Sequence, residues 1–258
     1  MKYKALFLDC DGTLIPYDYA ALPSDALARA IKKAEEKVSV CIVTGRAYPF
    51  TKPILEKLGL HSGILVANNG AEVIDLSTGK TLYERPIEEK DFRVIADYLN
   101  KENISFYAKQ DQKDLSYQEK HFSSSSGIKK VFMGFTEEIL SLEKAENILK
   151  FLSSLPTINA HKTHHADPDK YGIIFSHAQA TKMHGVSILL KELNLKKEEV
   201  IGVGDSYNDF PLLMASGLKV AMGNAVEELK EIADYIAPSV TEDGVVDVIE
   251  KFILTPTP

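Results

Sequence analysis

The sequence predicts an α/β protein: a doubly wound, mostly parallel, Rossmann-like core sheet interrupted by an inserted α+β cap domain. Over roughly the first 80 residues, short apolar runs alternate with helix-period stretches, which is typical of parallel strands joined by crossover helices. The pattern changes near Tyr83 and resumes after Thr181. We therefore expect a core domain formed by residues 1–83 and 180–258, and an insertion formed by residues 84–179.

Each element of the first core segment has a local signal. Pro23 and Ser24 mark the start of a helix in which apolar residues recur at i, i+3, i+4 and i+7. Gly59 marks the end of a second helix. In chain order, the predicted elements are a strand at 5–8, a helix after residue 24, a strand at 38–43, a helix at 49–58, a strand at 64–67 and a hairpin at 71–84.

The rest of the chain divides in the same way. Apolar residues at helical spacing indicate two helices in the insertion and one more after Thr181. Their apolar faces are Phe92, Ile95, Ala96 and Leu99; Leu142, Ala145, Leu149 and Leu152; and Val186, Leu189, Leu190 and Leu193. Strands at residues 200–203, 219–221 and 235–237 are expected to continue the core sheet.

Composition limits the classes of function. The chain has 258 residues, 45% of them hydrophobic, and a formal charge of -7, which argues against nucleic acid as a partner. No apolar run approaches the ~20 residues of a membrane span, and the N-terminus lacks the regions of a secretory signal. We expect a cytoplasmic protein without a membrane partner, with its two cysteines reduced, present as a monomer or weak homodimer.

The most informative run is Asp9-Cys10-Asp11-Gly12-Thr13, which follows the predicted strand at residues 5–8. The carboxyl end of a strand is where an open α/β sheet places its chemistry. If the extended backbone continued beyond the apolar run, Asp9 and Asp11 would project to the same side. Two like charges that close resist ionising together, so either a cation neutralises them or one keeps its proton. Gly12 allows a sharp turn, and the Thr13 hydroxyl can support a neighbouring carboxylate.

Three further polar features fall at the same predicted sheet edge. They are Thr44-Gly45-Arg46 after a strand, Lys182 at a helix start, and the run Gly-Asp-Ser-Tyr-Asn-Asp at residues 204–209. The Thr44 hydroxyl and the Gly45 amide can donate hydrogen bonds to a phosphate group, and Lys182 adds a compact positive charge. We leave Arg46 outside the predicted site, because an arginine after such a turn often pairs structurally with a core carboxylate.

Carboxylates complete the predicted site. Asp9 and Asp205 offer the oxygen ligands that suit a hard cation such as Mg²⁺, which keeps several waters and takes its other ligands from carboxylates and a substrate phosphate. The four features together predict a charge-balanced site for phosphate chemistry.

In the order and spacing of these motifs the chain resembles a haloacid dehalogenase (HAD) superfamily phosphatase of the Cof-like branch, in which a large α/β (C2-type) cap follows the third core strand. Asn68-Asn69-Gly70-Ala71 and the run Glu-Asp-Gly-Val at residues 242–245 also resemble that branch, so the resemblance covers nearly the whole chain. It implies a Mg²⁺-dependent phosphatase of small phosphorylated metabolites, chiefly sugar phosphates, with the cap closing over the substrate and selecting it.

The resemblance also implies a role for each matched residue. Asp9 would be the nucleophile that forms an aspartyl-phosphate, and Asp11 would be the general acid and base. Mg²⁺ would be held by the Asp9 carboxylate, the Asp11 main-chain carbonyl and the Asp205 carboxylate. The phosphoryl group would be bound by Thr44, Gly45, Lys182, Asn208 and the main-chain amide of Cys10. Asp209 would support the metal ligands or orient Lys182, and Thr13 would support a carboxylate.

Two other functions fit the same motifs. A phosphomutase or phosphotransferase of this fold would pass the aspartyl-phosphate to a hydroxyl group instead of water. A non-catalytic regulatory module would be phosphorylated on a strand-end aspartate and keep the phosphate. Asp11, Lys182 and the long insertion argue against the regulatory module.

Overall fold

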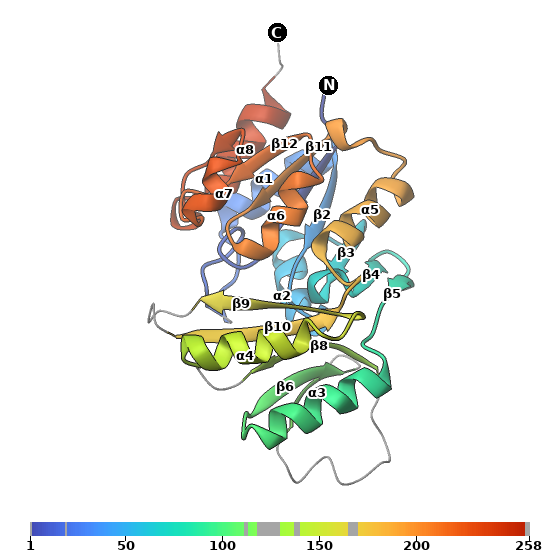
Figure 1. The fold of residues 1–258 in the computed structure, drawn as a ribbon. Coiled ribbons are helices and arrows are strands. Elements are labelled where there is room, and N and C mark those ends of the chain that lie inside the picture. Colours follow the sequence, from blue (N-terminus) through green and yellow to red (C-terminus); the bar gives the residue numbers. More distant parts are fainter. Residues whose placement is uncertain are drawn as a thin grey trace. The chain divides into compact units, whose positions relative to one another are not determined.

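The computed structural model describes residues 2–18, 20–110, 113–117, 130–136, 140–164 and 170–255 (Figure 1). The chain forms two compact units: unit 1 is Met1–Tyr83 with Thr181–Pro258, and unit 2 is Glu84–Ala180. Unit 2 extends one residue beyond the insertion expected at residues 84–179. Ala180 stays with unit 2 because its amide donates to the His177 carbonyl and its own carbonyl accepts from the Ser176 hydroxyl.

Unit 1 is built on one sheet whose central strands are parallel, as the sequence predicts. Its strands are, in sheet order, β13 (Tyr235–Ile236), β12 (Leu218–Ala221), β11 (Val200–Gly204), β1 (Ala5–Leu8), β2 (Ser39–Val43), β3 (Ile64–Ala67), β4 (Glu72–Asp75) and β5 (Thr81–Glu84). β4 is antiparallel to its neighbour β3, and it forms the predicted hairpin with the edge strand β5. Every residue of β1, β3 and β11 is buried, which explains their uninterrupted apolar sequences.

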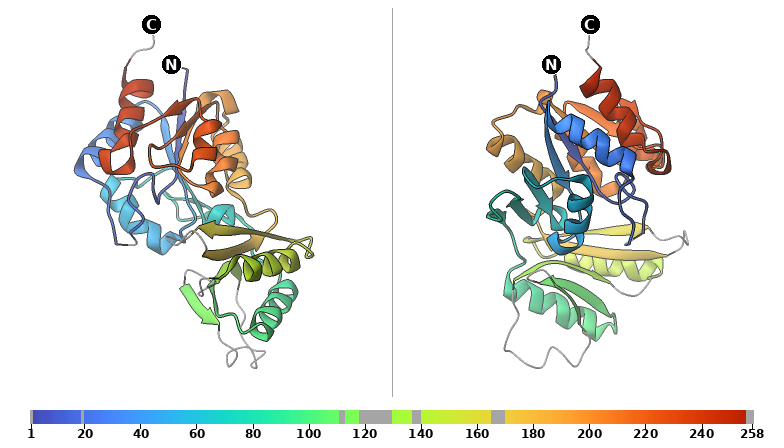
Figure 2. Two further views of the ribbon diagram at one scale, coloured as in Figure 1. Left: turned by 60° about the vertical axis from the view of Figure 1, so that its left-hand side comes forward. Right: turned by 180° about the vertical axis from the view of Figure 1, so that it is seen from behind.

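Helices cover both faces of this sheet (Figure 2). One layer contains α1 (Asp25–Glu35), α2 (Tyr48–Leu58) and α8 (Gly244–Ile249), and the other contains α5 (Lys182–Glu192) and α6 (Phe210–Met214). The short helix α7 (Glu227–Glu231) contacts β12, and a π-helical turn at Glu250–Leu254 continues from α8.

Capping residues set two of the helix ends as predicted. The Ser24 hydroxyl accepts a hydrogen bond from the Leu27 amide and so caps α1, and it also donates to Asp243. Gly59 ends α2 in the left-handed conformation, with φ of 78°.

Unit 2 has a core of its own. Its antiparallel sheet has the order β7 (Lys113–Tyr117), β6 (Phe106–Gln110), β8 (Val131–Thr136), β10 (Tyr171–His177) and β9 (Ile158–His164). Helices α3 (Glu89–Lys101) and α4 (Leu142–Leu152) pack on one face of this sheet, because their apolar residues share a buried cluster with sheet residues Phe106 and Phe175. The predicted α+β insertion therefore folds around a hydrophobic core of its own.

The helices and the two cysteines bear on the expectations drawn from composition. Within the described ranges, no helix combines the length and the apolar character that crossing a bilayer requires. Cys10 and Cys41 are both free and buried, and burial raises the pKa of the Cys41 thiol to about 12.

The turn after β3 carries unusual backbone conformations. Asn68, Asn69 and Gly70 all have positive φ, of 49°, 57° and 99° respectively. A Cβ atom on Gly70 would lie 2.1 Å from the carbonyl oxygen of Thr181, the residue that caps α5. The turn therefore brings the end of β3 against the start of α5, and only glycine permits that approach.

We predict that Gly70→Ala destabilises unit 1 more than Gly59→Ala does. Both residues have positive φ, but a Cβ on Gly59 has nothing within 4 Å, whereas a Cβ on Gly70 clashes with backbone. Gly59→Ala should cost roughly 1–2 kcal/mol through left-handed strain alone, and Gly70→Ala should cost clearly more. Urea unfolding of the two variants measures the difference, and equal losses would contradict the proposed contact.

Candidate active site

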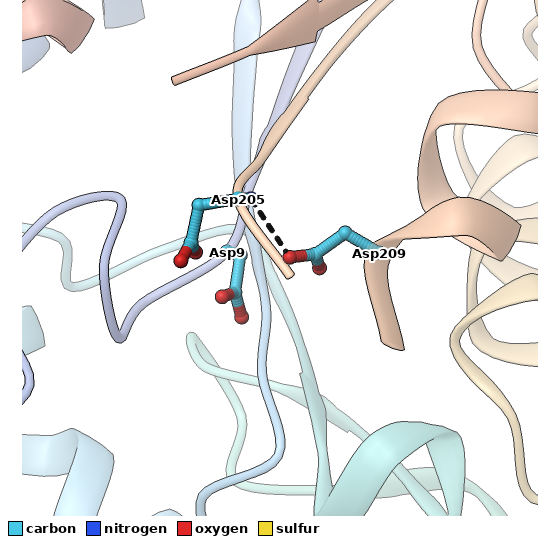
Figure 3. A group of neighbouring side chains, drawn as sticks. All are labelled: Asp9, Asp205 and Asp209. Atoms are coloured by element: carbon cyan, nitrogen blue, oxygen red, sulfur yellow. Dashed lines mark hydrogen bonds between the residues drawn. The ribbon is translucent and has the colours of Figure 1, made fainter. Parts of the chain in front are cut away.

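Three carboxylates converge at the carboxyl edge of the unit 1 sheet (Figure 3). Asp9 follows β1 and Asp205 follows β11, and these strands are parallel neighbours with Leu8 opposite Val203. Asp209 closes the short 3-10 helix Tyr207–Asp209. One carboxylate oxygen from each aspartate lies within 4.8 Å of the others. Their side chains are buried, because Asp9, Asp205 and Asp209 are 4%, 2% and 0% exposed.

Lys182 supplies the positive charge inside this cluster. Its Nζ donates to Asp9 Oδ1 at 2.5 Å and to Asp209 Oδ1 at 2.6 Å, and the residue is only 1% exposed. It is the first residue of α5, where Thr181 caps the helix. Three ionised carboxylates and one ammonium would leave an excess of two negative charges in a buried volume.

Asp209 has a supporting role in this arrangement. Its Oδ1 accepts from Lys182, and its Oδ2 accepts from the main-chain amides of Asp205 and Ser206, both at 3.0 Å. Both oxygens are thus engaged in holding the lysine and the turn that follows β11. Asp209 therefore positions Asp205 and Lys182.

Hydroxyl groups fix the orientation of Asp205. Thr13 donates to Asp205 Oδ1 at 3.1 Å, and Tyr17 donates to Asp205 Oδ2 at 2.5 Å. A Cβ on Gly12 would lie 2.2 Å from Asp205 Oδ2, so glycine allows the loop after β1 to approach the carboxylate. Residues 12–17 of this loop therefore form one side of the site around Asp205.

Burial of so much negative charge changes the protonation of the cluster. Desolvation and the neighbouring Asp209 raise the pKa of Asp9 well above its usual range, although Lys182 opposes this shift. The same two causes raise the pKa of Asp205 to about 7, although Tyr17 and Thr13 favour its ionised form. The carboxylates therefore need additional positive charge to ionise together at neutral pH.

The donor set fits a hard divalent cation. Asp9 and Asp205 present carboxylate oxygens to the same volume, and the excess negative charge is what such an ion would neutralise. Oxygen donors without a histidine or cysteine sulfur are the ligands that Mg²⁺ prefers. Asp9 and Asp205 are the residues that could hold the ion. Asp209 is committed to the Lys182 ammonium and to two main-chain amides, whereas each oxygen of Asp205 accepts one hydroxyl proton and keeps a lone pair for a cation.

The side chain of Asp11 lies outside the cluster of three carboxylates. Arg46 binds it through Nε at 2.9 Å to Oδ2 and through Nη2 at 2.6 Å to Oδ1. The expectation that Asp9 and Asp11 project together required the strand to continue, but β1 ends at Leu8 and the chain turns through Gly12, whose φ is 77°. Asp11 is instead paired with a guanidinium that is 4% exposed.

The residues expected to bind phosphate occupy the ends of β2, β11 and α5. Thr44 is fully buried, and its hydroxyl oxygen accepts the Arg46 amide, so the hydroxyl proton is directed elsewhere. Asn208 donates through Nδ2 to Asn69 Oδ1 at 3.1 Å. The side chain of Cys10 belongs to the hydrophobic core, and burial raises the pKa of its thiol, which leaves only its main chain for binding an anion.

Sequence reasoning missed three residues that contact this site. Arg46 is outside the site that the sequence predicts; it pairs with a carboxylate as expected, but that carboxylate is Asp11 of the site motif. Tyr17 and Asn69 carried no spacing signal, because each reaches a residue more than a hundred positions away in the sequence. For Asn69, the doubled asparagine before glycine indicated a left-handed turn, which the structure contains.

Comparisons with known proteins address the family. Residues 6–249 match the family described as haloacid dehalogenase-like hydrolase. This chain belongs to the haloacid dehalogenase-like hydrolase family. The resemblance to its Cof-like phosphatases is thereby confirmed, and with it the prediction that the chain is an enzyme.

Similar proteins of this family align over nearly the whole chain. A 5-amino-6-(5-phospho-D-ribitylamino)uracil phosphatase of Bacillus subtilis is 31% identical, with 97% of this chain and 96% of that protein covered. A phosphoglycolate phosphatase of Saccharolobus solfataricus is 30% identical with the same coverage. The structure of a haloacid dehalogenase-like hydrolase from B. subtilis superposes with a TM-score of 0.84 at 22% identity, covering 97% of this chain and 100% of that one.

We predict that, with metal removed by EDTA, the free energy of unfolding of Asp205→Asn increases relative to that of the parent chain as the pH rises. The pKa of Asp205 is about 7 in the fold, against an ordinary value of 3.8. Its contribution to stability is therefore complete below about pH 4 and is lost as the pH rises through about 7. Asparagine does not titrate, so the difference in free energy of unfolding should grow by on the order of 4 kcal/mol.

Urea unfolding at several pH values between 4 and 8 measures this difference. Asp97→Asn, on the exposed side of α3, is the matched control for replacing a carboxylate by an amide. A constant or falling difference for Asp205→Asn would contradict the raised pKa.

Proposed function

We propose that this hydrolase is a Mg²⁺-dependent phosphatase of small phosphorylated metabolites, and that Asp9 forms an aspartyl-phosphate intermediate. The observation that carries the proposal is the buried group of Asp9, Asp205 and Asp209 around Lys182 at the carboxyl edge of a parallel sheet. An anionic phosphoryl group needs compensating positive charge, and this site combines one buried ammonium with carboxylates suited to a cation.

Asp9 acts as the nucleophile in the proposed reaction. One of its oxygens accepts from Lys182, and the described residues donate no hydrogen bond to the other. A carboxylate oxygen of Asp9 forms a bond to phosphorus while the ester oxygen leaves with the bonding electron pair. Asp11 gives its proton to that oxygen, so the products of this step are an alcohol and the aspartyl-phosphate.

Hydrolysis of the intermediate restores the enzyme. Asp11, now a carboxylate, takes a proton from the attacking water, whose oxygen bonds to phosphorus as the bond to Asp9 breaks. Inorganic phosphate leaves, and Asp9 is again a carboxylate. When bound by the carboxylates of Asp9 and Asp205 and the main-chain carbonyl of Asp11, Mg²⁺ would offset the negative charge of the phosphoryl oxygens.

Three side chains and two main-chain amides bind the phosphoryl group in this proposal. Lys182 keeps one ammonium proton beyond the two it donates to Asp9 and Asp209. The others are the Thr44 hydroxyl, the Asn208 side-chain amide, and the main-chain amides of Gly45 and Cys10, with Thr13 and Asp209 supporting the carboxylates.

The chemistry of the site would serve any small phosphate ester, and the family suggests a narrower class of substrate. We propose sugar phosphates, with unit 2 acting as the cap that selects the leaving group. The relative that acts on a phosphorylated ribityl compound supports this class, since that group is a sugar alcohol phosphate. A location in the cytoplasm and a monomer or weak homodimer remain predictions.

We predict that Asp9→Asn abolishes turnover of p-nitrophenyl phosphate, because an amide is too weak a nucleophile to form the intermediate. EDTA should abolish the activity of the parent chain, and Mg²⁺ should restore it. Asp75→Asn, at the last residue of β4, is the matched control and should keep full activity. Retained turnover in Asp9→Asn would contradict the proposed nucleophile.

Hydrolysis and phosphotransfer are distinguished by the fate of the phosphoryl group. In ¹⁸O-labelled water the proposed phosphatase incorporates label into inorganic phosphate, whereas a phosphotransferase yields a new phosphate ester when an alcohol is supplied. A panel of phosphorylated sugars, nucleotides and pyridoxal phosphate, with and without Mg²⁺, tests the substrate class.

Arg46 is expected to act through Asp11. Its hydrogen bonds to both Asp11 oxygens fix the plane and position of the Asp11 carboxyl group, which must reach the leaving oxygen. We predict that Arg46→Met lowers kcat/KM for an alkyl phosphate at least about tenfold more than for p-nitrophenyl phosphate, because a nitrophenolate leaves without a proton. Arg46→Lys keeps the charge without the bidentate geometry and should give an intermediate loss. Equal losses on both substrates would contradict this role.

A further inference from the structure

We propose that Asn69 is a positioning residue for phosphoryl binding, because its side-chain oxygen holds the amide of Asn208 in the orientation that donates to phosphate. This inference rests on the proposed function and deepens it. Asn69 is not among the site residues predicted from the sequence, and it lies at the end of β3.

The hydrogen bond between the two asparagines defines which way the Asn208 amide faces. Asn208 Nδ2 donates to Asn69 Oδ1 at 3.1 Å, across 139 positions of sequence. An amide nitrogen carries two protons, so one remains for an anion after the first is donated to Asn69. An isolated asparagine can rotate its amide and offer oxygen in place of nitrogen, which would repel a phosphoryl group. Asn69 removes that alternative.

Asn69 also contacts the other phosphate-binding turn. Its main-chain amide donates to the Thr44 carbonyl at 3.0 Å, and a Cβ on Gly45 would lie 3.2 Å from Asn69 Oδ1. The side-chain oxygen that accepts from Asn208 therefore packs directly against the Gly45 backbone. One buried residue, 6% exposed, thus links the turn after β2 with the turn after β11.

The backbone conformation places Asn69 for both contacts. Its φ of 57° is left-handed, a conformation that asparagine adopts more readily than most residues, and Gly70 follows it against the Thr181 carbonyl. Thr181 directly precedes Lys182. The segment Asn68–Gly70 therefore contacts three separate parts of the chain that contain proposed phosphate-binding residues: the turn after β2, the turn after β11 and the start of α5. Asn68 differs from Asn69, because its amide donates to Glu72.

A double-mutant cycle tests whether Asn69 acts through Asn208. The variants are Asn69→Gly, Asn208→Ala and the pair, each assayed for kcat/KM on p-nitrophenyl phosphate and for inhibition by inorganic orthovanadate. Glycine keeps the left-handed backbone, so Asn69→Gly removes the amide without adding strain. Asn194→Gly is the matched control, since Asn194 has a φ of 51° at the opposite end of α5 from Lys182.

We expect Asn69→Gly to lower kcat/KM about tenfold and to weaken orthovanadate inhibition by a similar factor, the size of one hydrogen bond to a charged group. In the Asn208→Ala background the same change should have almost no effect, because the residue it positions is gone. Asn194→Gly should leave both values unchanged. A loss of equal size in both backgrounds, or no loss in either, overturns the proposal.

Two additions keep the test decisive. Glycine raises the conformational entropy of the unfolded chain, and Asn69→Gly could therefore unfold. In that case Asn69→Ala replaces it in the cycle, since alanine lowers that entropy and destabilises the fold only through backbone strain. Failure of the proposed function is recognised separately: the parent chain would then neither hydrolyse the phosphate ester nor be inhibited by orthovanadate. If the parent chain has both properties and the cycle shows no coupling, only the proposed role of Asn69 is contradicted.

Discussion

The ammonium group of Lys182 donates to Asp9 and Asp209 at 2.5 and 2.6 Å, and these two contacts connect segments from both ends of the chain. Removing one partner from such a buried group costs about 3–5 kcal/mol, because the remaining charges are left without compensation. The lysine alone does not balance three carboxylates, and the raised pKa values of Asp9 and Asp205 reflect that excess. The cluster therefore has too little positive charge for its three carboxylates, and this affects both stability and chemistry. A divalent cation must bind, or a carboxyl group must stay protonated, to balance it.

A neutral pair lies beside this charged cluster. Arg46 and Asp11 balance each other, so Asp11 adds no net charge to the volume that Asp9 and Asp205 share. The two carboxylates of one short motif thus have different electrostatic surroundings: one is buried with other acids and a lysine, and the other is held by a guanidinium. The proposed nucleophile Asp9 therefore needs a cation beside it to stay ionised among the other acids, whereas Asp11 is held in place for proton transfer by Arg46.

The sequence predicts where this site lies better than how its side chains are oriented. The strand ends before Asp9, Thr44 and Asp205 follow from buried apolar runs, and parallel strands bring such ends to one edge of the sheet. The turning of Asp11 toward Arg46 was not predictable in this way, because it depends on where β1 stops and how far a long side chain reaches. The contacts of Tyr17 and Asn69 depend on tertiary packing between distant segments, which neither periodicity nor motif spacing encodes.

The position of the insertion explains how one site can accompany a separately folded unit 2. The chain leaves unit 1 after Tyr83 and returns at Thr181, one residue before Lys182. Within unit 2, Arg85 Nε donates to Gln179 Oε1 at 3.0 Å, so the two ends of the insertion are held together. Closing a loop costs only about 0.6 kcal/mol more for each doubling of its length, so the size of unit 2 has little effect on the approach of Lys182 to Asp9. Because unit 2 has its own hydrophobic core around Phe92, Phe106 and Phe175, changes on its surface need not disturb that ion pair. The architecture therefore allows the surface of unit 2 to change while the contacts of Lys182 in unit 1 stay the same.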